Sequence, residues 1–152
     1  MNYLFLKIEQ SDFDKISAPI LFGSPKTDNI FATISKEDII YKFSWQSELI
    51  DPVIKNKDEN ELLIGVDLNF IAFDIETGEI LNQLSFDSFF LNIEQYDDIF
   101  YIITQLDIYR LGTSDFKIID TYSLPDIFDT ISASDSYIVV TTLGREQVLI
   151  PR

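Results

Sequence analysis

Residues 62–74 decide the fold prediction, and they read Leu-Leu-Ile-Gly-Val-Asp-Leu-Asn-Phe-Ile-Ala-Phe-Asp. Two short apolar runs flank a polar turn, which is the pattern of a β-hairpin. Residues 99–111 repeat this pattern as Ile-Phe-Tyr-Ile-Ile-Thr-Gln-Leu-Asp-Ile-Tyr-Arg-Leu. β-branched and aromatic residues dominate both stretches, and such residues favour strands. The two stretches therefore predict two hairpins of a repeat whose period is about 37–38 residues.

Each predicted hairpin continues with further strands. A third strand is expected at Glu79–Phe86 and at Phe116–Leu124, and a weaker fourth strand near Phe89–Glu94 and near Ile127–Ser132. The pattern extends in both directions along the chain. We therefore expect one all-β domain over residues 1–152, with antiparallel up-and-down strands in about three and a half blade-like repeats. The expected repeat boundaries are 28–61, 62–98, 99–136 and 137–152.

Helix is expected to be scarce in this chain. Short helical turns are possible at Phe13–Ile20 and at Glu48–Lys55. Pro19 and Pro52 interrupt these two segments, because proline cannot donate a main-chain hydrogen bond inside a helix.

One turn carries a resemblance to a known family. Residues 73–81 read Phe-Asp-Ile-Glu-Thr-Gly-Glu-Ile-Leu, in which a strand ends in Asp and a Thr-Gly turn leads into the next strand. This resembles the blade repeat of β-propellers of the YVTN or quinoprotein-like type. The resemblance covers about residues 28–150, and the full motif occurs once. It implies an open or incomplete propeller, because closed rings hold at least four and more often six to eight blades. A β-sandwich, a partial barrel and an unrelated meander of hairpins are the alternatives.

The composition excludes several classes of chemistry. The chain has 26 acidic and 11 basic residues, no histidine and no cysteine, so its formal charge is −15. Catalysis by a Ser-His-Asp triad or a Cys-His pair is impossible without these residues. The usual ligand sets for zinc, iron–sulfur clusters and haem are also missing. A charge of −15 repels phosphate backbones, so we expect no direct contact with nucleic acid. We expect no cofactor, no metal and no catalytic residue.

Two further features concern where the protein resides. No apolar run approaches the 18 residues or so that a membrane-spanning helix needs, so we expect no membrane partner. Lys7 interrupts the first apolar run, and no basic region precedes that run, which argues against a secretory signal. The sequence therefore predicts a cytoplasmic protein.

The acidic residues are concentrated in the middle of the chain. From Asp58 to Tyr109 there are 52 residues with no Lys or Arg, and 12 of them are acidic. In an up-and-down sheet, alternate turns lie at the same edge. We assign the turns near 27–29, 44–48, 57–61, 75–79, 96–98, 112–115 and 134–136 to one acidic edge. The residues expected to bind a partner there are Trp45, Asp58, Glu59, Glu61, Glu76, Glu79, Tyr96, Asp97, Asp98 and Asp115.

Other interpretations of the carboxylates remain open. Asp favours turns, and a high net charge also serves solubility. Carboxylate pairs such as Asp12 with Asp14, Asp74 with Glu76 and Asp97 with Asp98 are compatible with a glycoside hydrolase. The segment Asp58-Glu59-Asn60-Glu61 and the pair at 12 and 14 are rich in oxygen, but neither has the spacing of a calcium-binding loop.

These observations favour a non-enzymatic binding protein that neutralises a basic partner. In size, charge and architecture the chain looks like the single-domain immunity proteins of bacterial toxin systems, such as those of contact-dependent growth inhibition. That resemblance implies a cognate nuclease toxin as partner, whose nucleic-acid groove the acidic edge would block. A phage-type or DNA-mimic inhibitor follows the same charge logic. A carboxylate-based glycoside hydrolase and a scaffold domain with open sheet edges are the remaining alternatives.

Overall fold

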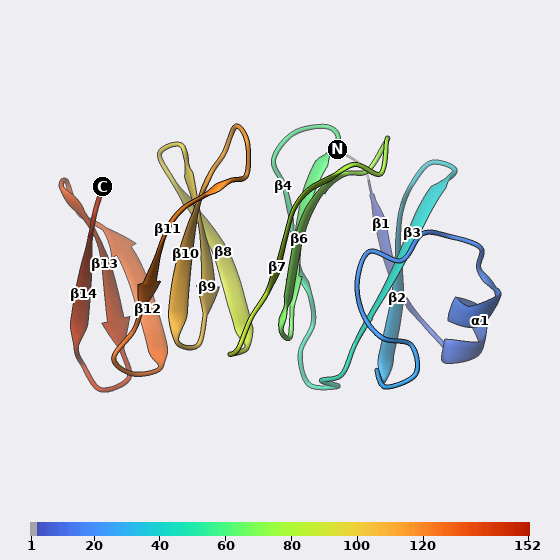
Figure 1. Ribbon diagram of the computed structural model, residues 1–152, viewed down its shortest axis with the longest axis horizontal. Coiled ribbons are helices and arrows are strands. Elements are labelled where there is room, and N and C mark those ends of the chain that lie inside the picture. The colour runs from blue at the N-terminus through green and yellow to red at the C-terminus, as the bar shows by residue number, and fades with distance from the viewer. Residues whose placement is uncertain (1–2) are drawn as a thin grey trace. The chain divides into compact units, whose positions relative to one another are not determined.

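The computed structural model describes residues 3–152, which form fourteen strands and one short helix (Figure 1). The helix is α1 (Gln10–Lys15). The strands are β1 (Leu4–Ile8), β2 (Ile30–Lys36), β3 (Ile39–Trp45), β4 (Val53–Asn56), β5 (Glu61–Val66), β6 (Asn69–Asp74), β7 (Ile80–Ser85), β8 (Phe90–Tyr96), β9 (Ile99–Thr104), β10 (Asp107–Gly112), β11 (Ile118–Ser123), β12 (Phe128–Ala133), β13 (Tyr137–Thr142) and β14 (Gln147–Pro151).

The strands form four antiparallel sheets along the chain. The first sheet has the order β1-β2-β3, the second β4-β5-β6-β7, the third β8-β9-β10-β11 and the fourth β12-β13-β14. No described sheet closes into a barrel, because each has two different strands at its margins. The prediction of an all-β chain with successive up-and-down sheets is confirmed.

The described contacts divide into two compact units, an N-terminal unit that ends at Ser85 and a C-terminal unit that starts at Phe86. The single-domain expectation stays a prediction.

The boundaries of the predicted repeats are shifted by one strand relative to the boundaries of the sheets. The repeat expected at 62–98 contains β5, β6, β7 and β8, whereas β8 pairs with β9 in the third sheet. The strand that opens the second sheet is β4, where the sequence suggested a helical turn. Pairing with an apolar neighbour explains this strand, because Ile54 lies opposite Ile64 and Lys55 opposite Leu63. The other expected helical turn lies earlier than predicted, as α1.

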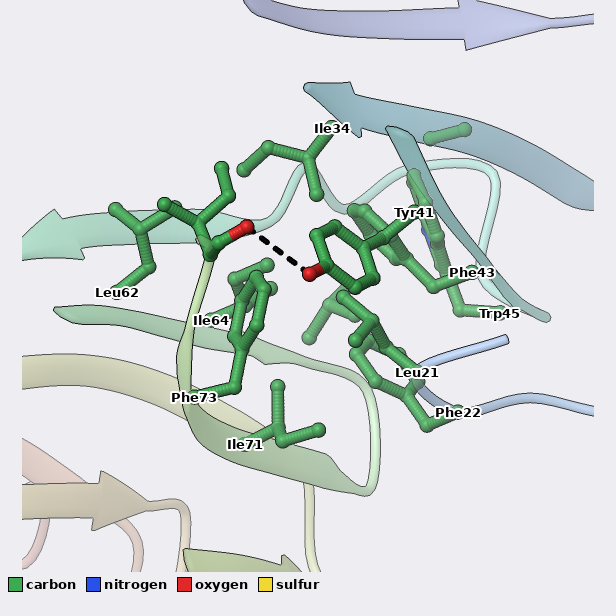
Figure 2. Packing of buried hydrophobic residues seen from close by; sticks show 13 residues of the cluster. Leu21, Phe22, Ile34, Tyr41, Phe43, Trp45, Leu62, Ile64, Ile71 and Phe73 are labelled. Atoms are coloured by element: carbon green, nitrogen blue, oxygen red, sulfur yellow. Dashed lines mark hydrogen bonds between the residues drawn. The ribbon is translucent and has the colours of Figure 1, made fainter. Parts of the chain in front are cut away.

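The core of the N-terminal unit lies between the first and second sheets. Alternate residues of a strand face the same side, so Leu62, Ile64 and Val66 of β5 present one apolar face. They pack in one cluster with side chains of the first sheet, including Phe43 and Trp45 (Figure 2). Burial of each such large side chain stabilises the fold by about 1.5–3 kcal/mol, and this supplies the main force that holds the two sheets together.

A chain segment covers the free margin of β3. The Leu21 amide donates to the Lys42 carbonyl, the Lys42 amide donates to the Pro19 carbonyl, and the Ser44 amide donates to the Phe22 carbonyl. This segment therefore acts as a short parallel strand and closes an edge that would otherwise be open to pairing.

Lys42 also holds α1 against the first sheet. Its ammonium group donates to the carbonyls of Phe13 at 2.8 Å and Ile16 at 2.9 Å, at the C-terminal end of the helix. It also lies over the Phe13 ring, 4.5 Å from its centroid. Lys42 is buried although it is charged, and these carbonyls replace the water that it loses.

The core of the C-terminal unit is built in the same way. Tyr101, Ile103 and Ile108 of the third sheet form one buried cluster with apolar residues of the fourth sheet. The residues from the fourth sheet that are fully or nearly fully buried in this cluster are Ile138, Val140 and Ile150.

Acidic residues occupy strained positions in several tight turns. Glu37, Asp67 and Asp97 each follow directly on a strand and have positive φ values of 55°, 53° and 56°. Aspartate tolerates this left-handed conformation better than most residues do. Part of the acidic composition is therefore explained by turn geometry.

Candidate functional site

Three turns of the N-terminal unit lie at the same end of its strands. They join β2 to β3, β4 to β5 and β6 to β7, and alternate turns of an up-and-down sheet share an end. Together with the strand residues that adjoin them, they carry eight acidic residues and two lysines, Lys36 and Lys57. We call these eight acidic residues the acidic rim: Glu37, Asp38, Asp58, Glu59, Glu61, Asp74, Glu76 and Glu79.

Hydrogen bonds tie the three turns to one another. The Lys36 ammonium group donates to the Asn60 side-chain oxygen at 2.7 Å and to the Glu59 carbonyl at 3.3 Å. The Ile75 amide donates to the Asn60 carbonyl at 2.8 Å. The Tyr41 hydroxyl donates to the Ile75 carbonyl at 2.9 Å, which joins the first sheet to the turn after β6 (Figure 2). These hydrogen bonds join the three turns into one connected arrangement.

The two lysines beside the rim are both engaged within the unit. Lys36 makes the two bonds to the turn after β4 described above. Lys57 forms an ion pair with Glu61, with 2.9 Å between its nitrogen and the carboxylate oxygen. Eight carboxylates against two ammonium groups leave these turns with an excess of negative charge, and the Lys57 ion pair neutralises Glu61.

Two rim carboxylates also organise their own turns. One oxygen of Asp58 accepts from the amides of Asn60 and Glu61, and one oxygen of Asp74 accepts from the amides of Glu76 and Thr77. The hydrogen bonds donated by the main-chain amides of Asn60 and Glu61 lower the pKa of Asp58, so this carboxyl group is ionised at neutral pH.

Five exposed carboxylates complete the rim. Within residues 3–152, the side chains of Glu37, Asp38, Glu59, Glu76 and Glu79 make no hydrogen bond or ion pair, and all five are exposed to solvent. They are the rim groups best placed to meet a cation from outside.

Trp45, which the sequence analysis assigned to the partner surface, lies in the core. Its side chain is 1% exposed, and its ring stacks on Phe43 with 5.7 Å between centroids. Its indole nitrogen donates to the carbonyls of Ser47 and Ile50. The tryptophan thus holds the loop between β3 and β4 through these two hydrogen bonds. Its ring is buried and is not part of the surface.

The predicted acidic edge joined turns that lie at opposite ends of the N-terminal unit. The turns at 27–29 and 44–48 lie at the end opposite the turns at 57–61 and 75–79. The reason is β4, which adds one chain reversal that the sequence analysis did not count. The same correction brings Glu37 and Asp38 into the rim. If Val53–Asn56 had been recognised as a strand in the sequence, the count of chain reversals would have placed these two residues at the same end as the turns at 57–61 and 75–79.

The remaining predicted residues belong to the C-terminal unit. Tyr96 is half-buried and packs edge-on against Tyr101, with 5.5 Å between ring centroids. Burial, followed by the charge of Glu94, raises the pKa of Tyr96. Asp115 accepts from the Lys117 amide in its own turn.

Asp97 and Asp98 have different surroundings although they are adjacent. Arg152 donates from its Nε to Asp97 at 2.8 Å and from Nη1 to the Ser134 carbonyl at 2.7 Å. This pairing lowers the pKa of Asp97. The Asp98 side chain is exposed and makes no bond within the part of the chain that the structure describes. Asp97 therefore serves the unit itself, whereas Asp98 faces solvent.

The carboxylates do not assemble a metal site among the described residues. No group of three or more His, Cys, Asp or Glu side chains in residues 3–152 is arranged to hold an ion. Asp12 and Asp14 are exposed on α1. Asp74, which the sequence pairs with Glu76, already accepts hydrogen bonds from the Glu76 and Thr77 amides.

Among residues 3–152, no helix has the length and apolar character needed to cross a membrane.

Comparison with models of known families and with curated proteins finds no match. Solved structures do show similarity to the chain. BamB from Moraxella catarrhalis is 16% identical with a TM-score of 0.46, over 90% of this chain and 44% of that one. The Pan2 WD40 domain from Neurospora crassa is 14% identical with a TM-score of 0.43, over 78% and 40%. Sqt1 from Saccharomyces cerevisiae is 11% identical with a TM-score of 0.36, over 82% and 53%. The chain thus spans about half or less of the length of these proteins.

Proposed function

We propose that this chain is a non-enzymatic binding protein that neutralises a basic protein partner through its acidic rim. One observation carries the proposal. Eight carboxylates lie on three turns that hydrogen bonds tie together, and the two lysines beside them are held within the unit. Opposite charge steers a partner to such a surface and speeds association. Because the turns are already fixed, binding loses little conformational entropy on this side.

We further propose that the partner is a cationic nuclease, as in bacterial toxin–immunity pairs. A nuclease binds the phosphates of nucleic acid with a basic groove, and the rim carboxylates would occupy that groove in place of phosphates. The charge of −15 and the all-β architecture support this more specific proposal. Inhibition would then follow from occlusion of the groove, with no chemistry on the part of this chain.

The test compares three baits in affinity capture from the host of this protein. The first bait is the wild type, and the second is the rim variant Glu59→Lys, Glu76→Lys, Glu79→Lys. The third is a control variant with the same change in net charge at exposed sites outside the rim, Asp14→Lys, Glu48→Lys, Asp87→Lys. We expect the wild type and the control to retain one basic protein, and the rim variant to bind it at least about tenfold more weakly. The affinity should also fall as salt rises.

The captured protein is then assayed for cleavage of RNA and DNA with and without this chain. Inhibition by the wild type and by the control, but not by the rim variant, is the expected result. Equal retention by the rim and control variants would show that the rim is not the contact. A partner that binds DNA without cleaving it would favour a DNA-mimic inhibitor. Hydrolysis of a sugar polymer that a single carboxylate substitution abolishes would overturn the binding-only proposal.

A further inference from the structure

Four large apolar side chains are exposed at one end of the strands of the C-terminal unit. Their exposed fractions are 42% for Phe89, 44% for Leu106, 40% for Ile127 and 57% for Leu143. They lie in the connections that precede β8 and follow β9, β11 and β13, and these share an end because each strand reverses the chain (Figure 1). The segments that carry them are 86–89, 105–107, 124–127 and 143–146. We call the four residues the apolar row.

Main-chain hydrogen bonds join these segments to one another. The Gln105 amide donates to the Phe89 carbonyl at 2.9 Å. The Phe128 amide donates to the Gln105 carbonyl, and the Leu143 amide donates to the Ile127 carbonyl, both at 2.8 Å. Consecutive members of the row are therefore linked by one of these bonds or through an adjacent residue, and the row forms one continuous surface.

Two buried hydroxyl groups fix the turn in the middle of the row. The Ser88 hydroxyl donates to the Thr104 hydroxyl at 3.0 Å and accepts from the Leu106 amide at 3.2 Å. The Thr104 hydroxyl also accepts from the Asp107 amide at 2.9 Å. These amides are used within the unit, so a partner meets the side chains of the row. A helix suits such a surface, because its own backbone groups are already paired.

Carboxylates flank one end of the row. A Cβ at Gly144 would approach the Asp126 carboxylate to 2.7 Å and the Glu146 carboxylate to 3.2 Å, so both groups lie beside this glycine. Within residues 3–152, the Asp126 carboxylate accepts a hydrogen bond only from the next amide along the chain, and the Glu146 side chain makes no bond. The segments of the row together contain four acidic residues and one basic residue, Arg145.

We propose that the apolar row binds an amphipathic helix of another protein, whose apolar stripe is flanked by lysine or arginine. Single exposed apolar residues are ordinary, but a continuous apolar surface bordered by charge marks an interaction site. The row contacts the stripe, and the carboxylates beside Gly144 meet the flanking cations. This second surface belongs to the C-terminal unit and does not depend on what the acidic rim of the N-terminal unit binds.

The same charges disfavour two other occupants of the row. A second copy of this chain would bring its own four acidic residues against these four, and like charges at an interface oppose association. A membrane with anionic lipids would repel the carboxylates in the same way. A cationic helix is the occupant that satisfies both the apolar and the acidic parts of the surface.

Three synthetic peptides of about 14 residues, which form four helical turns, test the chemistry of the partner. The first has leucines along one face of the helix and lysines elsewhere. The second has serine in place of every leucine, and the third has glutamate in place of every lysine. Isothermal titration should show that the wild type binds the Leu/Lys peptide at least about tenfold more tightly than either of the others.

A pair of double variants tests the residues. Leu106→Gln with Leu143→Gln should remove the preference for the Leu/Lys over the Ser/Lys peptide without a change in charge. Ile118→Gln with Ile119→Gln is the matched control, because these side chains are 47% and 55% exposed in β11, outside the segments of the row. It should keep the preference. Circular dichroism and thermal unfolding check that both double variants fold.

The rim variant Glu59→Lys, Glu76→Lys, Glu79→Lys should also keep the preference, although its overall affinity for lysine peptides falls. Failure of the acidic rim and failure of the apolar row are therefore distinguishable. Amide chemical shifts of the wild type locate the contact without any substitution. Titration with the Leu/Lys peptide should shift the four segments of the row most.

Several outcomes would overturn the proposal. One is a preference that the row variant and its control retain equally, and another is chemical shifts concentrated outside the four segments. Equal binding of the Leu/Glu peptide would exclude a basic partner. Binding to phosphatidylglycerol vesicles that the row variant abolishes would assign the row to a membrane. A dimer in sedimentation that the same variant abolishes would assign it to a second copy of the chain.

Discussion

The hydroxyl of Tyr41, in the first sheet, donates a 2.9 Å hydrogen bond to the main-chain carbonyl of Ile75, which lies 34 residues further along the chain and directly after β6 of the second sheet. Tyr41 is 4% exposed and packs edge-on against Phe73. Gly78 lies beside it with φ of 79°, and a Cβ at this glycine would approach the Tyr41 hydroxyl to 3.2 Å. This bond connects the acidic rim to the core of the N-terminal unit.

Tyr41→Phe is expected to destabilise the N-terminal unit by about 1–3 kcal/mol, because it leaves the buried Ile75 carbonyl without its donor. Urea unfolding followed by the fluorescence of the single tryptophan, Trp45, measures the change in the same core. Tyr137→Phe removes an exposed hydroxyl and is expected to change the stability by less than about 0.5 kcal/mol. Equal effects of the two substitutions would contradict the role of the bond.

Alkaline pH is expected to destabilise the protein. Burial is the first cause of the raised pKa values of Tyr41, Tyr96, Tyr101 and Tyr109. In the unfolded chain these groups lose their protons near the ordinary value of 10.0, whereas the folded chain retains them. Stability is therefore unaffected below that pH and falls as the pH rises above it. Thermal unfolding between about pH 9 and 12 should show this fall, with a smaller slope for Tyr41→Phe. A flat profile would mean that these hydroxyls ionise equally in both states.

Lys42→Met is expected to loosen α1 while it keeps most of the apolar stem of the side chain. The substitution removes the donor to the Phe13 and Ile16 carbonyls, a loss of about 1–3 kcal/mol for the docking of this segment. Hydrogen exchange should become faster at residues 10–16 and change little in β5 and β6. Lys26→Met, at an exposed site, is the control. Unchanged exchange at 10–16 in Lys42→Met would show that packing of Phe13 alone holds the helix.

Arg152→Gln is expected to lower the thermal midpoint of the C-terminal unit at neutral pH, because Arg152 joins the Asp97 turn to the Ser134 turn. The paired Asp97 has a lowered pKa, so its stabilising effect is present above the ordinary value of 3.8 and disappears as the pH falls through the folded value. The difference between wild type and variant should therefore shrink in acid. Arg145→Gln is the matched control, since Arg145 is exposed and makes no side-chain bond within residues 3–152. A difference that is independent of pH would count against the ion pair.

The hairpins themselves were predictable from local sequence. The apolar runs at 62–66 and 69–74 correspond to β5 and β6, and those at 99–104 and 107–112 to β9 and β10. Dense β-branched and aromatic residues separated by polar turns leave few other ways to bury these runs. The Asp-Ile-Glu-Thr-Gly turn after β6 was also recognisable, because Asp74 and Gly78 supply the acceptor and the positive φ that such a turn needs.

The strand β4 was not predictable in the same way. Val53–Asn56 is short, follows Pro52 and contains Lys55, so neither periodicity nor composition identifies it. It becomes a strand because β5 provides an apolar neighbour with free backbone groups. A single uncounted strand reverses the end at which all preceding turns lie, which is why the turns at 27–29 and 44–48 were assigned to the same end as those at 57–61 and 75–79. Trp45 misses the surface for a separate reason, because it ends β3 and is buried in the core.

The sequence alone determined the meander of hairpins and the acidity of its turns, since both depend on residues close together along the chain. The tertiary structure decided which turns share an end and which carboxylates remain exposed to solvent. Those outcomes depend on distant partners: Lys36 meets Asn60, Tyr41 meets Ile75, and Arg152 meets Asp97 only after the sheets have packed. Those contacts decide whether a charged side chain stays exposed to solvent or is neutralised within the fold.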